Sequence, residues 1–363
     1  MRKVLVIFGG VSPEHEVSCR SAAAVLENID RQKNQIHTIG ITKDGRWLYT
    51  RATAQEIANG TCNNKYQRKL KIPNGTWEAC PHIPATLSCD RINGGILVFE
   101  NDMVKRIEID VVMPMLHGEN GEDGRLQGLL ELANIPFVGP GMRASANGMD
   151  KATTKIVLAS AGIRQADYLI FCANTDPERI VSQVESKFAY PVFVKPSSTG
   201  SSCGVSKVRN KTELISAIQV AFRFDKKILV EEFINGREIE VAVWGDKSGT
   251  YASVCGEIDP GAEFYDYDTK YVNDTSVCHI PADLPEDTAK AIRRTAIEAF
   301  ETLECKGQSR VDFFALEDGG YVLNEINTLP GFTSISMYPK LMMYSQNLTY
   351  AQLLEKMLDG AEV

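Results

Sequence analysis

Residues Val4-Leu-Val-Ile-Phe-Gly-Gly10 decide how the chain begins to fold. Their run of apolar, mostly β-branched side chains predicts a strand buried on both faces of a parallel sheet. The two glycines end the strand, and Ser12-Pro-Glu14 is typical of the N-cap, first position and acidic first turn of a helix. A second strand over residues 36–41 would complete a β-α-β unit. That unit predicts an open α/β sheet whose ligands bind beyond the carboxyl ends of its strands.

The bulk composition predicts an ordinary globular protein of two or three domains. Of the 363 residues, 44% are hydrophobic and 24% are charged, and the formal net charge is -8. Acidic and basic residues are interspersed, which argues against nucleic acid as a partner because phosphate-backbone binding needs concentrated positive charge. Nine cysteines without a C-x-x-C pair indicate reduced thiols. The apolar run from Val4 to Phe8 is too short for a signal peptide, and no stretch approaches the ~20 apolar residues that span a bilayer. We therefore expect a cytoplasmic protein with no membrane partner.

The rest of the chain predicts further strands and helices. Strands are expected over 111–114, 136–139, 190–195, 227–232 and 237–244, and helices over 124–133, 150–160 and 285–303. Pro140-Gly141 is predicted to end the first domain. Residues 52–106 are polar and contain Asn-Gly and Gly-Gly, so they predict only short strands and loops.

A β-hairpin is predicted near the C-terminal end of the sequence. Ser309–Leu316 and Tyr321–Asn327 both contain alternating polar and apolar residues, and the turn residues Glu317-Asp-Gly-Gly320 lie between them. If this four-residue loop closes a regular antiparallel hairpin, Leu316 lies opposite Tyr321.

One face of this hairpin would gather polar side chains. The register places Asp312 opposite Glu325, and Arg310 opposite Asn327, on the same face because strand side chains alternate. Opposed carboxylates repel each other unless a cation lies between them, and oxygen ligands suit Mg²⁺. The alternative is a solvated outer face, but such faces usually mix Lys and Thr with Glu. The pattern therefore favours a metal site at Asp312, Glu325 and Asn327.

Other segments carry candidate ligand-binding groups, each with a structural alternative. Lys195 precedes a loop of small residues over 196–204, which could hold a phosphate or could be a flexible surface loop. His117 follows a buried strand among glycines, where it could be a ligand contact or a structural histidine. Glu14 could contact a ligand or complement a helix dipole. The aromatic residues of 263–271 suit either the core or a loop that closes over a ligand.

A series of motifs runs in order along nearly the whole chain. They are Gly9-Gly-x-Ser-x-Glu-x-Glu-Val-Ser18, His117-Gly-x-x-Gly-Glu-Asp-Gly124, Met149-Asp-Lys151, Val194-Lys-Pro196, Gly200-Ser-Ser202, Tyr265-Asp-Tyr-x-x-Lys-Tyr271, Arg310-Val-Asp312, Asn324-Glu-x-Asn327 and Pro330-Gly-x-Thr-Ser-x-Ser336. Together they resemble the ATP-grasp superfamily and, within it, the D-alanine–D-alanine ligases. The resemblance implies an α/β fold with α+β elements, in which an open parallel α/β domain (1–141) precedes two ATP-grasp subdomains (142–230 and 231–363). Residues 52–106 carry no family motif and are interpreted as a variable elaboration of the first domain.

The resemblance also implies the residues that bind ATP and metal. Lysines would hold the phosphates, three residues of a hinge strand would contact adenine, and one carboxylate would contact the ribose. These residues are, in that order, Lys151, Lys195 and Lys270; Glu231, Glu232 and Ile234; and Glu238. Two Mg²⁺ ions, with Mn²⁺ as a substitute, would bind at Asp312, Glu325 and Asn327.

Further residues are implied for the amino-acid substrates. Glu14 would bind the ammonium group of the first D-alanine, with His117 beside its carboxylate. Ser336 would hold the carboxylate of the second D-alanine. The two donors of an oxyanion hole would be Arg310 and the backbone N–H of Gly331. A trio of Glu14, Ser201 and Tyr271 would tie a closing loop over the site.

The implied reaction is phosphoryl transfer followed by amide formation. The first D-alanine carboxylate attacks the γ-phosphate of ATP, and the second D-alanine amine attacks the resulting acyl phosphate. The product would serve peptidoglycan synthesis, and the family suggests a homodimer. One alternative keeps the chemistry and takes D-serine or, as a weaker candidate, D-lactate as the second substrate. Tyr271 favours an amine nucleophile, which argues against D-lactate but does not exclude D-serine. Another is a noncatalytic nucleotide sensor or dinucleotide-binding protein, but Gly9-Gly10 is not part of a G-x-G-x-x-G motif and a sensor would not need the metal face.

Overall fold

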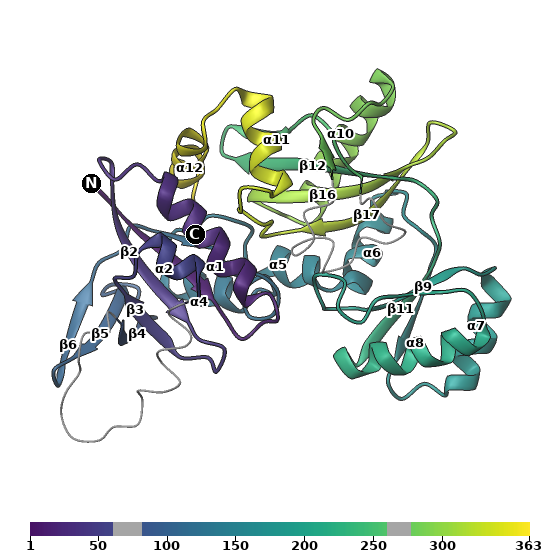
Figure 1. The fold of residues 1–363 in the computed structure, drawn as a ribbon, viewed down its shortest axis with the longest axis horizontal. Helices are drawn as coiled ribbons and strands as arrows, with labels where there is room; N and C mark the ends of the chain where they lie inside the picture. The colour runs from purple at the N-terminus through teal and green to yellow at the C-terminus, as the bar shows by residue number, and fades with distance from the viewer. Residues whose placement is uncertain (61–81, 260–276) are drawn as a thin grey trace.

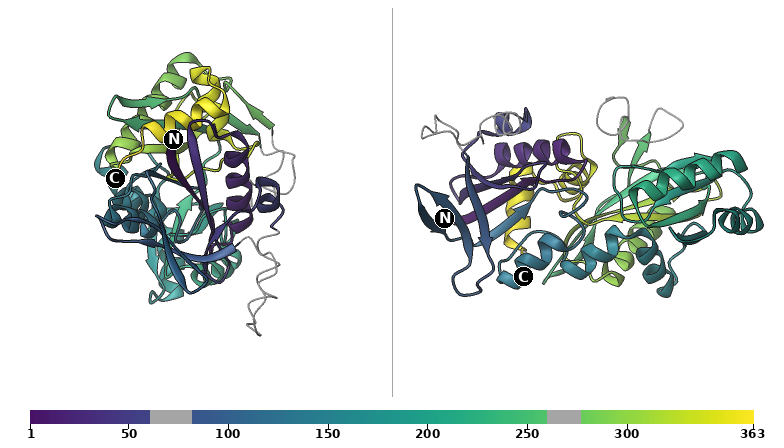
Figure 2. Two further views of the ribbon diagram at one scale, coloured as in Figure 1. Left: turned by 90° about the vertical axis from the view of Figure 1, so that its left-hand side faces the viewer. Right: turned by 90° about the horizontal axis from the view of Figure 1, so that it is seen from below.

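The computed structural model describes residues 1–60, 82–259 and 277–363. In this part of the chain three β-sheets with their helices form an elongated molecule (Figures 1 and 2). The N-terminal sheet lies at one end and a small four-stranded sheet lies at the other. The C-terminal sheet, with α10 and α11 beside it, lies between them in Figure 1. No helix of the described residues is both long and apolar enough to cross a membrane.

The N-terminal sheet has the strand order β6-β5-β4-β3-β2-β1-β7. Its strands are β1 (Arg2–Gly9), β2 (Asn34–Ile41), β3 (Trp47–Thr50), β4 (His82–Ser88), β5 (Gly95–Glu100), β6 (Met103–Ile107) and β7 (Val111–Pro114). As predicted from 4–8, β1 is buried on both faces and pairs in parallel with β2 and β7. The remaining pairs are antiparallel, so the described part of 52–106 extends the parallel centre as a meander.

The helices that accompany this sheet include one that starts later than predicted. They are α1 (His15–Asn28), α2 (Ala54–Ala58), α4 (Arg125–Ala133) and α5 (Met142–Met149). The N-cap of α1 is Glu14 and not Ser12, because the Ser12 hydroxyl accepts the Glu14 N–H at 3.1 Å in a local turn. Glu14 thereby lies between the carboxyl end of β1 and the helix. The strand predicted over 136–139 is reduced to single bridges of Phe137 with Val112 and Glu362.

The central sheet is antiparallel and has its own hydrophobic core. Its strand order is β10-β9-β11-β8, and it is preceded by α6 (Lys151–Ser160). The elements are β8 (Tyr168–Cys172), α7 (Pro177–Lys187), β9 (Val192–Pro196), β10 (Ser206–Val208), α8 (Lys211–Phe224) and β11 (Lys227–Glu232). Buried residues of 171–230 pack together between this sheet, α7 and α8. The glycine- and serine-rich loop after β9 lies between β9 and β10.

The C-terminal sheet carries the predicted hairpin. Its strand order is β15-β14-β12-β16-β17, and β13 pairs with β12. The elements are β12 (Arg237–Asp246), β13 (Gly249–Ala252), β14 (Gly256–Asp259), β15 (Val277–His279), α10 (Glu286–Thr302), β16 (Gly307–Ala315), β17 (Tyr321–Asn327), α11 (Met337–Gln346) and α12 (Tyr350–Asp359).

The register of the β16–β17 hairpin agrees with the prediction at its polar end and departs from it near the turn. Asp312 pairs with Glu325, and Arg310 pairs with Asn327, as expected. A β-bulge follows Asp312, so Ala315 rather than Leu316 lies opposite Tyr321. The turn is therefore one residue longer than predicted. The bulge compensates for this with one additional residue in β17, so the predicted pairs at the polar end are kept.

One hydrophobic core joins the first and last parts of the chain. It combines buried residues of β1 and α1 with residues of β12, α11 and α12; its members include Val4, Val6, Val25, Trp244, Tyr338, Leu354 and Leu358. Arg2 also forms an ion pair with Asp359. The N-terminal and C-terminal sheets are thus fastened together, whereas the central sheet encloses a separate core. The domain limits at 141 and 230 stay a prediction.

Candidate active site

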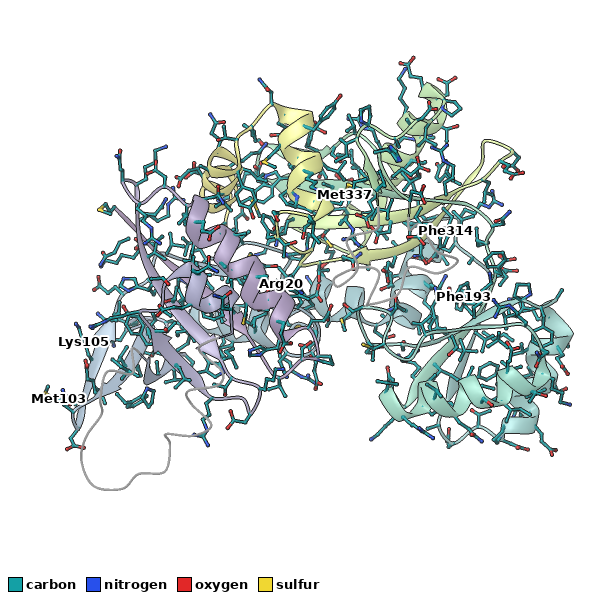
Figure 3. All side chains as sticks on the ribbon, in the orientation of Figure 1. Arg20, Met103, Lys105, Phe193, Phe314 and Met337 are labelled. Atoms are coloured by element: carbon teal, nitrogen blue, oxygen red, sulfur yellow. The ribbon has the colours of Figure 1, made fainter. Side chains whose placement is uncertain are left out.

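A cavity of about 1270 Å³ lies between the N-terminal part of the chain, the central sheet and the C-terminal sheet. Figure 3 marks Phe193 of β9 and Phe314 of β16, which both line it. Every predicted site residue within the described part of the chain also lines it: Glu14, His117, Lys151, Lys195, Ser201, Glu231, Glu232, Ile234, Glu238, Arg310, Asp312, Glu325, Asn327, Gly331 and Ser336. Lys270 and Tyr271 lie outside the described residues. The cavity therefore gathers residues from α1 and the loop after β7, from the central sheet and from the C-terminal sheet.

Glu14 is buried between two glycines and a serine. Its carboxylate accepts a hydrogen bond from the Ser201 hydroxyl of the central loop. A Cβ on Gly118 would lie 2.5 Å from Glu14 Oε2, and one on Gly200 would lie 2.9 Å from the same atom. Ser201 and Ser202 both have positive φ, a strained conformation for residues other than glycine. The loop is thus bent so that it closes on Glu14.

His117 is held in one tautomer by its neighbours. Its Nδ1 lies 3.0 Å from the Leu329 carbonyl, which can only accept, so Nδ1 carries the proton. Burial lowers the pKa of His117, against the opposing effect of Glu14. The neutral ring therefore accepts the Ser21 hydroxyl at Nε2, over 3.1 Å. Ser21 in turn accepts the backbone N–H of Phe332 at 3.2 Å. His117 thus links α1 to the segment that contains Gly331.

Glu122 is a buried carboxyl group that the sequence reasoning did not assign a role. It accepts the N–H of Gly118 at 2.6 Å and the N–H of Leu329 at 3.3 Å. Burial, reinforced by the charge of Glu14, raises the pKa of Glu122 to about 8. Glu122 therefore connects the loop after β7 to the loop after β17 in a largely protonated form at neutral pH. Its place in the His117–Gly124 motif was the available signal.

The polar face of the hairpin is bound together by charge-assisted hydrogen bonds. Arg310 donates from Nε and Nη2 to the two oxygens of Asp312, at 2.8 and 2.7 Å. Asn327 donates its amide to Asp312 at 2.9 Å. Arg310 Nε also lies 3.1 Å from Glu240 on β12, a buried residue that the sequence reasoning missed. Burial alone would lower the pKa of Arg310, but Asp312 and Glu240 raise it well above its ordinary value.

The donor set of this face fits a magnesium ion. The described residues contain no ready cluster of three His, Cys, Asp or Glu side chains. Two opposed carboxylates, Asp312 and Glu325, and the carboxamide of Asn327 instead line the open cavity. Mg²⁺ is commonly held by one or two carboxylates and completes its shell with water and substrate phosphates. The incomplete oxygen set is therefore what a shared metal–phosphate site requires.

Two lysines approach the same cavity from opposite elements. Lys151, the first residue of α6, donates to the Thr199 carbonyl at 2.7 Å and lies 3.9 Å from Glu325. Lys195 of β9 lies 2.7 Å from Glu231 Oε2 and 3.5 Å from the Asn324 side chain. Positively charged side chains thus approach the polar face of the hairpin from α6 and from the central sheet.

Glu231, which the resemblance places at an adenine contact, is a buried carboxylate. It is 4% exposed, and a second lysine, Lys155 of α6, lies 3.2 Å from its other carboxylate oxygen. Burial would raise the pKa of Glu231, but Lys195 and Lys155 outweigh it and lower the pKa to about 2. Burial lowers the pKa of Lys155, while Glu231 opposes that effect. Lys155 belongs to no recognised motif, so no sequence pattern pointed to it.

The segment between β11 and β12 borders the apolar end of the cavity. Glu232 turns its carboxylate to the Asp167 N–H, at 2.8 Å. Strand pairing places Phe193 beside Glu231, and Phe314 beside Glu238. Two aromatic rings therefore neighbour the residues predicted to contact a nucleoside.

The loop after β17 lines the same cavity as the polar face of the hairpin. A Cβ on Gly331 would lie 2.8 Å from the Ser336 hydroxyl oxygen, so the loop is tightly folded there. That hydroxyl accepts the Thr333 N–H at 3.0 Å and lies 2.8 Å from the Thr333 hydroxyl. Ser336 is also the N-cap of α11, where the helix dipole favours an anion.

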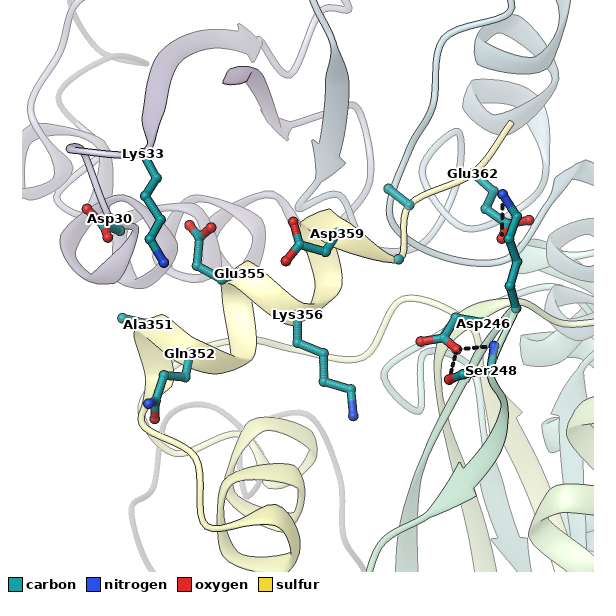
Figure 4. Close-up of a pocket in the computed structure, with 13 residues that line it drawn as sticks. Asp30, Lys33, Asp246, Ser248, Ala351, Gln352, Glu355, Lys356, Asp359 and Glu362 are labelled. Atoms are coloured by element: carbon teal, nitrogen blue, oxygen red, sulfur yellow. Dashed lines mark hydrogen bonds and ion pairs between the residues drawn. The ribbon is translucent and has the colours of Figure 1, made fainter. Parts of the chain in front are cut away.

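A second hollow of about 620 Å³ lies beside α12 and is shown in Figure 4. Its lining mixes lysines with carboxylates, and several are already paired. Lys247 lies 3.7 Å from Glu362, and Asp246 accepts the Ser248 hydroxyl and the Trp244 indole N–H. None of the predicted site residues lines this hollow. The large cavity is therefore the candidate active site.

Comparisons with known proteins agree along the whole chain. Residues 3–140 match the family described as D-ala D-ala ligase N-terminus, and residues 157–359 match D-ala D-ala ligase C-terminus. A D-alanine--D-alanine ligase of Acetivibrio thermocellus is 50% identical, covering 99% of this chain and 96% of the relative. One from Ruminiclostridium cellulolyticum is 46% identical, covering 99% and 95%.

Solved structures show the same likeness. The VanG D-Ala:D-Ser ligase from Enterococcus faecalis superposes with a TM-score of 0.85 at 38% identity, covering 99% of this chain and 98% of that one. The D-alanine-D-alanine ligase from Coxiella burnetii gives a TM-score of 0.82 at 32% identity, covering 99% and 95%.

Proposed function

The chain belongs to the D-alanine–D-alanine ligase family, and we propose that its cavity joins two D-alanine molecules with the conversion of ATP to ADP and phosphate. The observation that carries this proposal is the meeting of Glu14, the Arg310–Asp312–Glu325–Asn327 face and two lysines in one cavity. An ammonium-binding carboxylate and a phosphate-binding face are what a carboxylate–amine ligase needs side by side.

ATP would lie between the central and C-terminal sheets. The adenine would lie in the apolar end of the cavity near Phe193 and Phe314, with the hinge residues Glu231, Glu232 and Ile234 along one side. Its ribose would reach Glu238. Its phosphates would extend toward Lys151 and Lys195, which approach from α6 and β9. Lys270 remains a proposed further contact to the phosphates.

Magnesium would be held by Asp312, Glu325 and Asn327. When bound, Mg²⁺ would neutralise charge on the phosphates during transfer, and Mn²⁺ would be able to replace it. Arg310 already neutralises Asp312 in part through two hydrogen bonds. Its third contact, with Glu240, would keep the guanidinium oriented while Asp312 turns to other ligands.

The first D-alanine would bind beside α1. Glu14 would take its ammonium group, aided by the buried position that Gly118 and Gly200 permit. The D-alanine carboxylate would then attack the γ-phosphate and form an acyl phosphate. His117 is neutral and fully bonded to Ser21 and Leu329, so its contribution would be to hold the walls of this subsite in place.

The second D-alanine would bind at the loop after β17. Its carboxylate would meet Ser336 at the start of α11, and its amine would attack the acyl phosphate carbonyl. The Arg310 guanidinium and the Gly331 N–H would stabilise the oxyanion that forms. Excluding water protects the acyl phosphate from hydrolysis, so we propose that Tyr271, with Glu14 and Ser201, closes the site.

The second substrate has an alternative that one comparison raises. The superposition with a D-Ala:D-Ser ligase leaves D-serine open as the nucleophile. Phosphate release should be measured with ATP and D-alanine alone, and then with D-serine or D-lactate added at a low D-alanine concentration. Turnover with D-alanine alone and D-alanyl-D-alanine as product is the expected result. A product consisting mainly of a mixed dipeptide or depsipeptide would contradict the proposal.

The remaining proposals concern the cellular setting. We propose that the protein acts in the cytoplasm on small-molecule substrates, as a homodimer, and supplies a precursor of peptidoglycan. They rest on the family membership and on composition, and sedimentation of the purified protein tests the dimer.

A further inference from the structure

Lys155 is a buried lysine that lies behind the wall of the cavity. Its side chain is 3% exposed, and its Nζ lies 3.2 Å from Glu231 Oε1. The same nitrogen donates to the Ala166 carbonyl at 3.3 Å and lies 5.2 Å from the centre of the Tyr168 ring. Burying an ammonium group is unfavourable unless a negative partner compensates, so the contact with Glu231 defines its position.

Glu231 has a cationic neighbour on each carboxylate oxygen. Lys195 Nζ lies 2.7 Å from Oε2, and Lys155 Nζ lies 3.2 Å from Oε1. The three side chains together carry one net positive charge. The two lysines differ in access, because Lys195 lines the cavity and is 15% exposed, whereas Lys155 is enclosed. Only Lys195 is placed to exchange its partner for a ligand.

The geometry points to Lys155 as a positioning residue that neutralises Glu231, so that Lys195 is free to leave Glu231 and bind the phosphates of the nucleotide. This inference rests on the proposed function, which places ATP beside Lys195. With Lys155 in place, breaking the Lys195–Glu231 contact leaves the carboxylate paired. Without Lys155, the same step would leave a buried carboxylate without either of its lysine partners. Lys195 would then stay on Glu231.

A purely structural role for Lys155 makes a different prediction. Lys155 also connects α6 to the Ala166 carbonyl, and its own carbonyl accepts the Gln165 side chain at 3.0 Å. If it only held these segments together, its loss would displace Glu231 and weaken every adenosine-containing ligand alike. If it releases Lys195, its loss weakens ligands that carry phosphates and leaves adenosine binding unchanged.

Calorimetric titrations with ATP and with adenosine separate the two roles. Lys155→Met removes the charge with little change in length, and Lys155→Arg keeps the charge. We expect Lys155→Met to weaken ATP binding at least tenfold and adenosine binding less than twofold, and Lys155→Arg to remain close to wild type for both ligands. Equal losses for ATP and adenosine, or no loss for ATP, would overturn the inference.

A second comparison tests whether Lys155 acts through Glu231. It does not depend on whether Lys155→Met alone folds normally. In a Glu231→Gln background the carboxylate charge is absent, so Lys195 needs no release. Adding Lys155→Met to Glu231→Gln should therefore change ATP affinity less than twofold. A tenfold loss in that background would show that Lys155 acts by another route. Melting curves followed by circular dichroism establish that each variant is folded.

Lys195→Met separates the inference from the proposed function. It should weaken ATP binding in the otherwise wild-type chain, because Lys195 is the proposed phosphate ligand. Unchanged ATP binding in Lys195→Met, or no ATP binding by the wild type, would refute the proposed function itself. Weakened ATP binding in Lys195→Met, as expected, together with wild-type ATP affinity in Lys155→Met would refute only the role of Lys155.

Discussion

Ser201 donates its hydroxyl hydrogen to the carboxylate of Glu14 across a separation of 187 residues in sequence. The bond joins the loop of the central sheet to the start of α1. Lys151 makes a similar connection by donating to the Thr199 carbonyl of the same loop. The central sheet encloses its own core, so such polar contacts at the cavity are among those that position it against the rest of the molecule.

Ser201→Ala should raise the KM for the first D-alanine and lower kcat/KM by about 10- to 100-fold, because a hydrogen bond to a charged group contributes ~1.5–3 kcal/mol. ATP binding, for which we propose other residues, should change little. Steady-state kinetics with Ser198→Ala, an exposed serine of the same loop, as the control will check this. Equal effects of the two substitutions would contradict a specific role for the Ser201–Glu14 bond.

Glu325→Gln should abolish most of the turnover while leaving the fold intact. The carboxylate lies opposite Asp312 across the hairpin, and a neutral amide would remove one of the two proposed charged metal ligands. Magnesium titrations of activity should show a large increase in the Mg²⁺ concentration required. Glu317→Gln, in the exposed turn of the same hairpin, is the matched control. Undiminished ligation by the Glu325 variant would refute the metal assignment.

Arg310→Lys should lower kcat by about 100-fold or more, which is the scale of losing an oxyanion donor. A lysine cannot reproduce the two parallel bonds to Asp312 together with the contact to Glu240. Nucleotide affinity should be much less affected than kcat. Arg294→Lys, on the exposed face of α10, controls for the change of side chain. A drop confined to KM for ATP would argue against the oxyanion role.

Glu122 should make folding stability fall as pH rises. Its pKa is about 8 in the folded protein against an ordinary value of 4.5. Between these values the folded state binds more protons than the unfolded state, so the free energy of unfolding decreases, by up to about 1.4 kcal/mol per pH unit. Urea unfolding of wild type and Glu122→Gln across pH 5 to 8, without divalent cations, measures this contribution. Parallel pH profiles would show that Glu122 does not titrate in this range.

Leu354→Ala should destabilise the N-terminal and C-terminal sheets together. Leu354 on α12 is fully buried in the core that also contains Val4 and Val25. A leucine-to-alanine change in such a core costs about 2–5 kcal/mol. Leu132→Ala, at a position 61% exposed, should cost far less. Hydrogen exchange should show the loss of protection in β1 and in β12 alike; protection lost only near α12 would contradict a shared core.

The sequence predicted the hairpin face because period-two alternation and the turn fix a register over a short distance. Arg310, Asp312 and their partners therefore lie as expected. The bulge after Asp312 was not predictable from alternation, because an inserted residue changes the pairing at one end and preserves it at the other. The N-cap of α1 was misplaced for a related reason. Ser12 forms its own turn, and a capping residue and a turn residue look alike in sequence.

Long-range burial explains what the sequence could not supply. Glu122 and Lys155 contact residues that are distant along the chain. Lys155 looks like an ordinary helix lysine in the sequence, and the motif that contains Glu122 does not show that its carboxyl group is buried. Glu240 is hidden in the same way, because β12 meets β16 only in the folded sheet. The predicted roles of Lys270 and Tyr271 fall outside the described residues and stay predictions.

The core shared by α1 and α12 also bears on how the protein is made. Residues 4–26 leave the ribosome more than three hundred residues before residues 353–358, which complete their packing. Until then, the core around β1 and α1 is incomplete, and incompletely packed apolar surface favours aggregation. The central sheet needs no such wait, because its core comes from residues 171–230 alone. The central sheet can therefore fold during synthesis, whereas β1 and α1 complete their packing only after residues 353–358 have been made.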